Sequence, residues 1–281
     1  MPRLSIIVVT YNSTGSIDAC LESLVRNAPG VDHETVVVDN ESPDGTAAEV
    51  RGRWPEVRVI DAGANVGFAR ANNIGIRQTS GRFVLLLNPD AEVRPGALDR
   101  LVAVLDACAD AAVVGPRLVD GRGRAELSFG SMMGPFTELR QRLLVRGSMR
   151  GLPFVQRYVE RVTRRPHEVD WVSGACLLVR RADADAVGLL DERYFMYAED
   201  VDFCAAIRAR GRTVLFTPDA EVVHARGQSR ASAPRTTDMA YRRSHLAFYQ
   251  KHHPGWAPLL RAYLTLRRQL PDMPIDPPRS H

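Results

Sequence analysis

The sequence has no apolar run long enough to cross a bilayer. No window of the chain approaches the ~20 apolar residues that a transmembrane helix needs. The apolar run at residues 4–9 is also shorter than the core of a secretory signal peptide. We therefore expect a cytoplasmic protein, with any membrane contact made from the inner face of the cell membrane.

Cysteine is scarce. The four cysteines, Cys20, Cys108, Cys176 and Cys204, form no CxxC pair, and no His/Cys spacing typical of zinc sites occurs. Cys20 and Cys204 fall on the apolar sides of predicted helices, so we expect the cysteines to be small buried hydrophobes in a reducing compartment.

Neither sign of charge dominates, because 37 basic residues stand against 33 acidic ones. No nucleic-acid-binding motif accompanies the arginines, and two acidic clusters would repel phosphates, so we expect no nucleic-acid partner. The glycine fingerprint GxGxxG is also missing after the first predicted strand, where residues 10–15 read TYNSTG. This argues against an NAD(P)-dependent oxidoreductase.

Apolar strand-like segments alternate with amphipathic ones through the first 115 residues. Residues 4–9 are rich in β-branched side chains, which is typical of a strand buried on both faces. Ile17, Cys20, Leu21 and Leu24 recur at helical spacing. The same patterns predict strands at residues 35–38, 57–60, 83–87 and 113–114, and helices at 68–78 and 95–108. This order predicts an α/β fold with a mostly parallel, Rossmann-like sheet flanked by helices.

The pattern loosens after about residue 128. Residues 139–165 contain eight arginines and one acid, Glu160, with an apolar stripe at helical spacing inside them. Further on we predict strands at 171–179, 213–216 and 221–224, a helix at 199–210 and an amphipathic helix around 256–264. Residues 271–281 are rich in proline, and we expect them to be disordered.

Two aspartates follow predicted strands directly. Asp39 comes after residues 36–38, and Asp90 lies two residues beyond the strand at 83–87. Ligands of parallel α/β sheets bind at these carboxyl ends. A carboxylate there can accept from a base or ribose, or hold Mg²⁺ or Mn²⁺ on a diphosphate. The simpler alternative is an aspartate that caps its own turn.

Three further features could carry chemistry. The glycine turn at 63–67 leads into a helix with Arg70, which suits phosphate or a nucleobase unless the arginine is merely solvated. Glu199, Asp200 and Asp202 open a helix among aromatic residues; one could act as general base, or all could simply favour the helix N-terminus. His224 is either a structural histidine or a metal ligand beside Asp90.

These segments, taken in order, resemble the GT-A-fold glycosyltransferases of family 2. The resemblance covers roughly residues 4–227 and rests on five stretches: 5–12 (SIIVVTYN), 36–42 (VVVDNES), 65–73 (NVGFARANN), 88–91 (NPDA, in the place of the DxD motif) and 199–202 (EDVD).

The resemblance implies a role for each matching residue. Thr10 and Tyr11 would line the base pocket, Asp39 would accept from the base or ribose, and Arg70 would reach the base or phosphates. The other donor-binding positions would be Asn12, Asn65, Gly67, Asn73, Asn88 and Asp90. Asp90 and His224 would hold the divalent metal, Mg²⁺ or Mn²⁺. Asp200 would be the catalytic base, with Glu199 and Asp202 in support, and the acceptor would contact Trp171, Ser173, Gly174 and Glu199.

The implied reaction is the inverting transfer of a sugar from a nucleotide-diphosphate donor, dTDP- or UDP-linked, to a glycan or lipid-linked acceptor. Asn88 stands where many relatives have aspartate, and this variant resembles the rhamnosyltransferase-like branch. That branch favours dTDP-L-rhamnose as donor and polyprenyl-diphosphate-linked acceptors in cell-wall or surface polysaccharide assembly. A UDP-hexose or UDP-galactofuranose donor remains an alternative, as does a non-catalytic homologue that binds nucleotide and lipid carrier. The absence of QxxRW argues against the processive cellulose and chitin synthases.

We therefore expect a GT-A domain over residues 1–227, with a donor-binding half to about 115 and an acceptor-binding half from about 116. A basic helical insertion would occupy about 136–166, and residues 228–281 would form a C-terminal helical extension and a disordered tail. The arginine-rich insertion suits an anionic membrane surface. The alternatives are a solvated hairpin covering the sheet or the surface of a homodimer.

Overall fold

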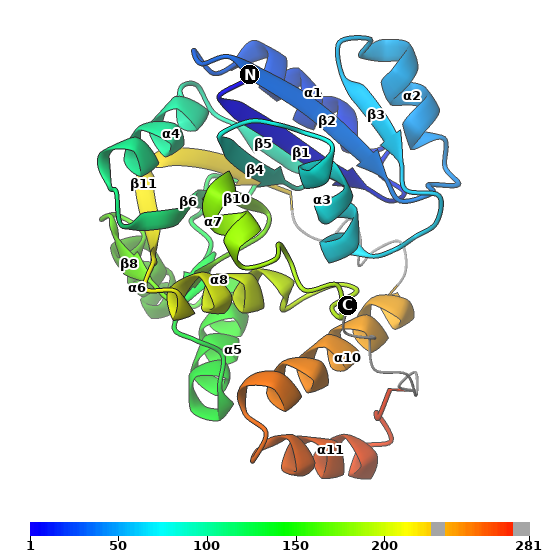
Figure 1. Cartoon of the computed structure of the whole chain (residues 1–281). Helices are drawn as coiled ribbons and strands as arrows, with labels where there is room; N and C mark the ends of the chain where they lie inside the picture. The colour runs from blue at the N-terminus through cyan, green and yellow to red at the C-terminus, as the bar shows by residue number, and fades with distance from the viewer. Residues whose placement is uncertain (226–233, 272–281) are drawn as a thin grey trace.

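The computed structural model describes residues 1–225 and 234–271 (Figure 1). Within these residues a nine-stranded sheet has the order β3-β2-β1-β4-β10-β6-β11-β5, with β8 paired to β11. The N-terminal strands pair in parallel; they are β1 (Leu4–Thr10), β2 (His33–Asp39), β3 (Arg58–Asp61) and β4 (Phe83–Leu87). This order is that of a doubly wound sheet, so the predicted α/β fold class is confirmed.

The second half of the sheet is mixed. Its strands are β5 (Ala91–Val93), β6 (Ala111–Val119), β8 (His167–Val169), β10 (Cys176–Arg180) and β11 (Thr213–His224). β10 runs antiparallel to both β4 and β6, with Cys176 opposite Leu87. The start of β10 therefore lies beside the end of β4, which brings the loop before β10 to the edge where Asp90 stands.

Helices cover both faces of the sheet. One face carries α1 (Ile17–Arg26), α2 (Thr46–Arg53) and α4 (Ala97–Ala107); the other carries α3 (Phe68–Arg77), α7 (Arg181–Ala186) and α8 (Glu199–Ala209). Successive side chains of a strand point to opposite faces. Leu4, Ile6 and Val8 of β1 accordingly pack with α1, while Ile7 and Val9 pack with α3. The result is a three-layer core with both faces of β1 buried.

Four predicted strands differ from the structure. The expected strand at 113–114 is part of the nine-residue β6, whose continuation was hidden by Gly115 and Pro116. Gly115 is needed there, because a Cβ would come within 2.7 Å of Val172. The expected strand at 171–179 is broken into β9 (Trp171–Val172) and β10 by a turn, and β9 pairs with β7 (Phe129–Gly130) in a separate ribbon. The expected strands at 213–216 and 221–224 are one strand, β11, with a shift of register between Thr217 and Glu221.

The remaining helices lie against the acceptor-side half. α5 (Pro135–Met149) and α6 (Pro153–Val162) form a helical hairpin in the arginine-rich region. α10 (Pro234–His252) and α11 (Ala257–Leu266) form a second pair, seen below the sheet in Figure 1. No helix in the described ranges is long and apolar enough to span a membrane. Residues 228–233 and 272–281 of the expected extension and disordered tail lie outside the described residues.

Within the expected C-terminal helical extension, α10 lies at positions for which no helix was predicted. Its inward-facing residues recur at helical spacing and include Tyr241, His245, Phe248, Tyr249 and His252. Tyrosine and histidine carry polar groups, so this stripe is weakly apolar although much of it is buried. Its polar atoms are bonded to Glu138 and Asp202, residues of distant segments.

Candidate active site

Asp39 ends β2 at the carboxyl edge of the sheet. One of its carboxylate oxygens accepts hydrogen bonds from Thr10 Oγ1 (2.9 Å) and Ser42 Oγ (2.6 Å), and the other accepts from Ser42 N (2.9 Å). The carboxylate is buried and holds the ends of β1 and β2 together. In this structure Asp39 caps its own turn, and its contact with a nucleotide stays a prediction.

The turn after β1 presents two of the predicted base-pocket residues. Tyr11 is 39% exposed, so its ring is available to a ligand. Asn12 has φ 54°, and its backbone N–H donates to Ser42 Oγ. The buried Asn12 Oδ1 has no hydrogen-bond partner in the structure. A buried acceptor without a partner is rare, which favours a ligand donor at this position.

The stretch 65–73 makes different contacts in the structure from those that the resemblance implies. The α3 N-terminus is not open to phosphate, because Phe68 N–H donates to the Phe195 carbonyl (2.7 Å). Gly67 has φ 85°, and a Cβ on it would come within 2.4 Å of that same oxygen. Gly67 is thus a close-approach position between the two halves of the fold, and Asn65 Oδ1 accepts from its N–H.

Two further residues of this stretch, Asn73 and Arg70, contact the segment before α8. Asn73 is fully buried, and its amide bonds Leu190 N and O and Glu192 Oε1. We therefore correct its expected role from nucleotide binding to fixing the segment before α8. Arg70 is mostly exposed and lies 3.7 Å from the Glu192 carboxylate. Its predicted contact with the base or phosphates would require that pair to separate.

Asp90 and His224 meet at the end of β4. His224 Nε2 lies 3.3 Å from Asp90 Oδ1 and 3.4 Å from Asn88 Nδ2. They are brought together because β11 pairs with β5, which places His224 opposite Ala91. The sequence separation of 134 residues is thereby closed, as the metal-ligand hypothesis required.

Glu126, which no sequence pattern indicated, lies beside the ring nitrogen of His224 that does not face Asp90. Glu126 Oε2 lies 3.6 Å from His224 Nδ1, and both side chains are largely buried. Burial alone would lower the pKa of His224, but Asp90 and Glu126 outweigh it and raise the pKa to about 9. A carboxylate and an imidazole are ligands that suit Mn²⁺, and the outer carboxylate can orient the ring. The described residues contain no cluster of three or more such ligands, so diphosphate oxygens and water would complete a metal shell.

Asp200 lies one residue into α8 and is held by backbone groups. Its Oδ2 accepts from Gly174 N (2.9 Å) and its Oδ1 from Val201 N (2.8 Å). Burial raises the pKa of Asp200 above its ordinary value, although these two bonds oppose the rise. Tyr197 and Ala198, just before the helix, both have positive φ, 72° and 68°. Such backbone strain tends to be kept where it aims a functional side chain.

Glu199 and Asp202 flank Asp200 on α8 but do not share its surroundings. Glu199 is buried, and burial together with the charge of Asp200 raises its pKa well above the usual range. Asp202 points toward α10, where it accepts from Tyr194 Oη, Lys251 and His252. The expectation that Asp202 supports the acceptor is therefore corrected, because its carboxylate fastens the C-terminal helices to the domain.

A cavity of about 230 Å³ opens beside Asp200. Trp171 lines it, and Gly174 and Ser173 belong to the turn that holds Asp200; their contact with an acceptor stays a prediction. The rest of its wall comes mainly from α5 and α10 and includes Thr137, Glu138, Gln141, Arg142, Tyr241 and His245. Glu138 accepts from Tyr249 and pairs with His245 across this wall. No sequence pattern indicated these residues, because their contacts join segments about 100 residues apart.

The protein has a Rossmann-like α/β fold, in which Asp39, Asp90 and His224 lie at the ends of sheet strands. Solved structures share this fold across almost the whole chain. The mannosyltransferase PcManGT from Pyrobaculum calidifontis, in complex with GDP-Man and Mn²⁺, superposes with a TM-score of 0.63 at 20% identity, over 94% of this chain and 70% of that one. S. aureus TarS 1–349 in complex with UDP-GlcNAc gives 0.58 at 20% identity, over 95% and 72%.

Sequence comparison identifies the family. The model described as Glycosyl transferase family 2 matches residues 5–188. The chain is 32% identical to an N-acetylglucosaminyl-diphospho-decaprenol L-rhamnosyltransferase of Mycobacterium tuberculosis, over 95% of this chain and 92% of that protein. It is 29% identical to the low-salt glycan biosynthesis hexosyltransferase Agl10 of Haloferax volcanii, over 73% and 61%. The chain therefore belongs to glycosyl transferase family 2, as its motifs predicted.

Proposed function

We propose that this chain is a metal-dependent, inverting glycosyltransferase that uses dTDP-L-rhamnose and a polyprenyl-diphosphate-linked sugar as acceptor. The observation that carries the proposal is the placement of Asp200. The backbone N–H groups of Gly174 and Val201 hold its carboxylate in the wall of a cavity, and Gly174 belongs to the loop before β10, which lies beside the end of β4. Kinship over 95% of the chain with an L-rhamnosyltransferase that acts on such an acceptor supports the choice of substrates.

Asp200 would act as the general base. Its fixed carboxylate can take the proton of an acceptor hydroxyl while that oxygen attacks the anomeric carbon of the donor. A single attack from the side opposite the leaving diphosphate inverts the anomeric centre. Trp171 would stack on the acceptor sugar, and buried Glu199, with its raised pKa, would sit behind Asp200 as a hydrogen-bond donor.

Asp90 and His224 would hold the divalent cation, Mg²⁺ or Mn²⁺. The carboxylate and imidazole stand 3.3 Å apart, close enough to share one ion after a small separation. A bound cation would neutralise the charge that develops on the departing nucleoside diphosphate. Asn88, whose amide points at His224, would hydrogen-bond the donor and keep the local negative charge lower than a second aspartate would.

The nucleotide would lie over the ends of β1 and β2. Tyr11 is exposed for stacking on the base, and the unpartnered Asn12 Oδ1 would accept one of its N–H groups or a ribose hydroxyl. Thr10 and Asp39 would support this surface from below through their mutual hydrogen bond. On this assignment the donor half ends near residue 115, and the acceptor half and C-terminal helices supply the other side of the cleft.

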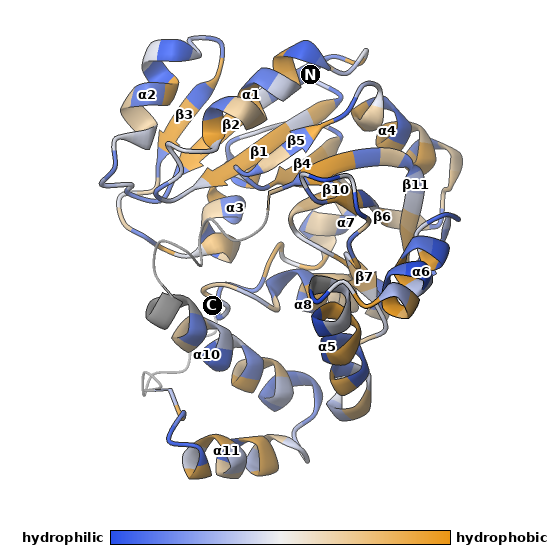
Figure 2. Cartoon of the chain, turned by 180° about the vertical axis from the view of Figure 1, so that it is seen from behind, coloured by the Kyte–Doolittle hydropathy of each residue, from blue (hydrophilic) through white to orange (hydrophobic). Residues whose placement is uncertain are grey.

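We also propose that the protein works at the inner face of the cell membrane. Exposed apolar side chains gather on α5 and α11, where Figure 2 shows hydrophobic bands; Phe136, Leu139, Leu143, Leu259, Tyr263 and Leu266 are each more than half exposed. Phe136 and Trp256 join the two helices, with ring centroids 6.3 Å apart. Flotation with anionic vesicles tests this surface by comparing the wild type with Leu259→Ser/Leu266→Ser, which should bind the vesicles less. A variant that floats like the wild type refutes it, and concentration-dependent sedimentation without flotation would assign the surface to a homodimer.

A thermal-shift panel tests the donor. We expect dTDP-L-rhamnose to stabilise the protein more than UDP-glucose, UDP-galactofuranose or GDP-mannose, and only with Mn²⁺ or Mg²⁺ present. Transfer is then measured onto a short-chain N-acetylglucosaminyl-diphospho-lipid. A larger shift with a UDP-sugar would reassign the donor. A donor-induced shift without transfer to any lipid-linked sugar would favour the non-catalytic alternative.

A further inference from the structure

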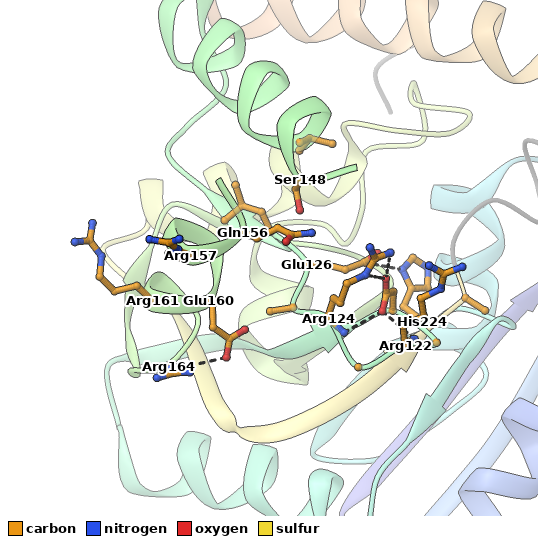
Figure 3. A pocket seen from close by; sticks show the side chains of 17 residues that line it. Arg122, Arg124, Glu126, Ser148, Gln156, Arg157, Glu160, Arg161, Arg164 and His224 are labelled. Atoms are coloured by element: carbon orange, nitrogen blue, oxygen red, sulfur yellow. Dashed lines mark hydrogen bonds and ion pairs between the residues drawn. The ribbon is translucent and has the colours of Figure 1, made fainter. Parts of the chain in front are cut away.

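A second cavity, of about 960 Å³, lies outside the mechanism described so far. Figure 3 shows its two walls. The loop at 120–127 and the end of β11 form one wall, with Arg122 and Arg124 next to His224. The hairpin of α5 and α6 forms the other, with Arg157 and Gln156. One end of this cavity is therefore the same imidazole that stands beside Asp90.

The lining is strongly basic. Its cationic side chains are five arginines, Arg122, Arg124, Arg157, Arg161 and Arg164, against three carboxylates, Asp120, Glu126 and Glu160. Two of the three carboxylates, Asp120 and Glu160, pair with arginines, and the third, Glu126, lies beside His224. Asp120 binds Arg124, and Glu160 receives two bonds of 2.9 Å from Arg117, which lies outside the lining, besides one from Arg164.

Three guanidinium groups are left over. Arg122, Arg157 and Arg161 form no ion pair with a carboxylate in the part of the chain that the structure describes; Arg161 lies over the Tyr158 ring. Guanidinium groups match phosphate oxygens in geometry and charge, and bind them more strongly where water is partly excluded. The surplus positive charge of the cavity therefore suits a multiply charged phosphate ligand.

One helix, α5, contributes side chains both to this cavity and to the small cavity beside Asp200. Gln141 of α5 lines the small cavity beside Asp200, and Val145 and Ser148 line the large one. These positions are four and three residues apart, so they lie on one face of α5 and span roughly 10 Å. A single acceptor can run along this face, with its sugar hydroxyl at Asp200 and its phosphates at the arginines.

An apolar exit adjoins the basic lining. Leu152 and Phe154 stand at the turn between α5 and α6 and are 38% and 70% exposed, and Leu143 on α5 is 60% exposed. Leu152 is one helical turn before the lining residue Gln156, and Phe154 one turn before Arg157. A hydrocarbon chain attached to a phosphate in the cavity would meet these side chains on leaving it.

We propose that the large cavity binds the diphosphate of the lipid-linked acceptor, with Arg122 and Arg157 as its principal cations and the Leu152–Phe154 turn as the way out for the lipid. This inference rests on the proposed transfer to a polyprenyl-diphosphate-linked sugar. On the proposed function, the donor diphosphate would be held at Asp90 and His224, with its nucleotide over the ends of β1 and β2. The cavity would thus select acceptors that carry a diphosphate.

The test compares two acceptors that differ only in the phosphates. Arg122→Gln/Arg157→Gln is assayed with farnesyl-diphospho-N-acetylglucosamine and with octyl N-acetylglucosaminide, which has no phosphate. The matched control is Arg150→Gln/Arg165→Gln, which removes two exposed arginines of the same region that do not line the cavity. We expect at least a tenfold rise in KM for the diphosphate acceptor, with KM for the phosphate-free acceptor and for the donor unchanged, and no such rise in the control.

The outcomes separate this inference from the function on which it rests. Equal effects on both acceptors, or none, would overturn it, and a loss of dTDP–Mn²⁺ binding would give the cavity to the donor. Calorimetry with farnesyl diphosphate, at saturating dTDP and Mn²⁺, gives a readout without transfer. Farnesyl diphosphate binding that depends on Arg122 and Arg157 would support the site even if no sugar is transferred. Inorganic pyrophosphate that binds as tightly as farnesyl diphosphate would argue against a lipid-linked ligand.

Discussion

The two halves of this molecule assemble their chemistry in different ways. In the N-terminal half the key side chains stand at the ends of β2 and β4, the parallel strands on either side of β1, and Asp39 and Asp90 follow buried runs of only a few residues. In the C-terminal half the cavity beside Asp200 is built by α5, α8 and α10, whose contacts join residues about 100 positions apart, as in the Glu138–His245 pair. Local sequence therefore encodes Asp39 and Asp90 on the donor side, whereas tertiary packing brings in His224 and builds the acceptor side.

Asp200→Asn is the change with the largest expected effect. It removes the base on the acceptor side while keeping the shape of the side chain, so kcat should fall by roughly 10²–10⁴-fold. Binding of dTDP with Mn²⁺, a property of the donor side, should not change. Both carboxylate oxygens accept backbone N–H bonds, so the asparagine NH₂ group would face one of these donors, and the melting temperature should fall slightly. Near-wild-type transfer would show that Asp200 is not the base.

The contrast between the halves explains what the sequence could predict. The strand–helix alternation, Asp39, Asp90 and Asp200 all follow from segments of ten residues or fewer, and the family motifs fall in those segments. Asn73 and Asp202 were misassigned because the same segments do not reveal their partners, Leu190 for the first and Lys251 and His252 for the second. Glu126, Glu138 and α10 were missed for the same reason.

Asp90→Ala tests the donor side alone. Loss of the carboxylate should weaken Mn²⁺-supported dTDP binding by roughly tenfold or more, since even residues behind metal ligands are commonly worth ~10–100-fold in affinity. Binding of the acceptor without donor should persist. Glu92→Ala, an exposed acid two residues further on, is the control. Titration calorimetry with and without Mn²⁺ measures the affinity for dTDP. Identical dTDP affinities of Asp90→Ala and the wild type would show that Asp90 is not a metal ligand.

Gly67→Ala tests the close contact between Gly67 and Phe195, which joins the two halves of the fold. Two costs add: φ 85° is unfavourable for alanine, and the new Cβ would come within 2.4 Å of the Phe195 carbonyl oxygen. We expect a loss of about 3 kcal/mol in the free energy of unfolding. Gly63→Ala isolates the first cost, since Gly63 has φ 77° with nothing within 4 Å, and should lose about 1 kcal/mol. Denaturant melts of the two variants check this, and equal losses would show that the Phe195 contact is not constraining.

The pH profile of transfer gives the smallest and most specific test of the acceptor side. Burial raises the pKa of Asp200 above the ordinary value of 3.8, and a general base works only when it is deprotonated. As the pH falls, the rate should therefore begin to drop at a higher pH than for an exposed aspartate, by about tenfold per unit below the pKa. The residual rate of Asp200→Asn should lack this acid limb. Measuring dTDP–Mn²⁺ affinity at each pH removes any contribution from the donor side, and an acid limb that persists in Asp200→Asn would assign the titration to another group.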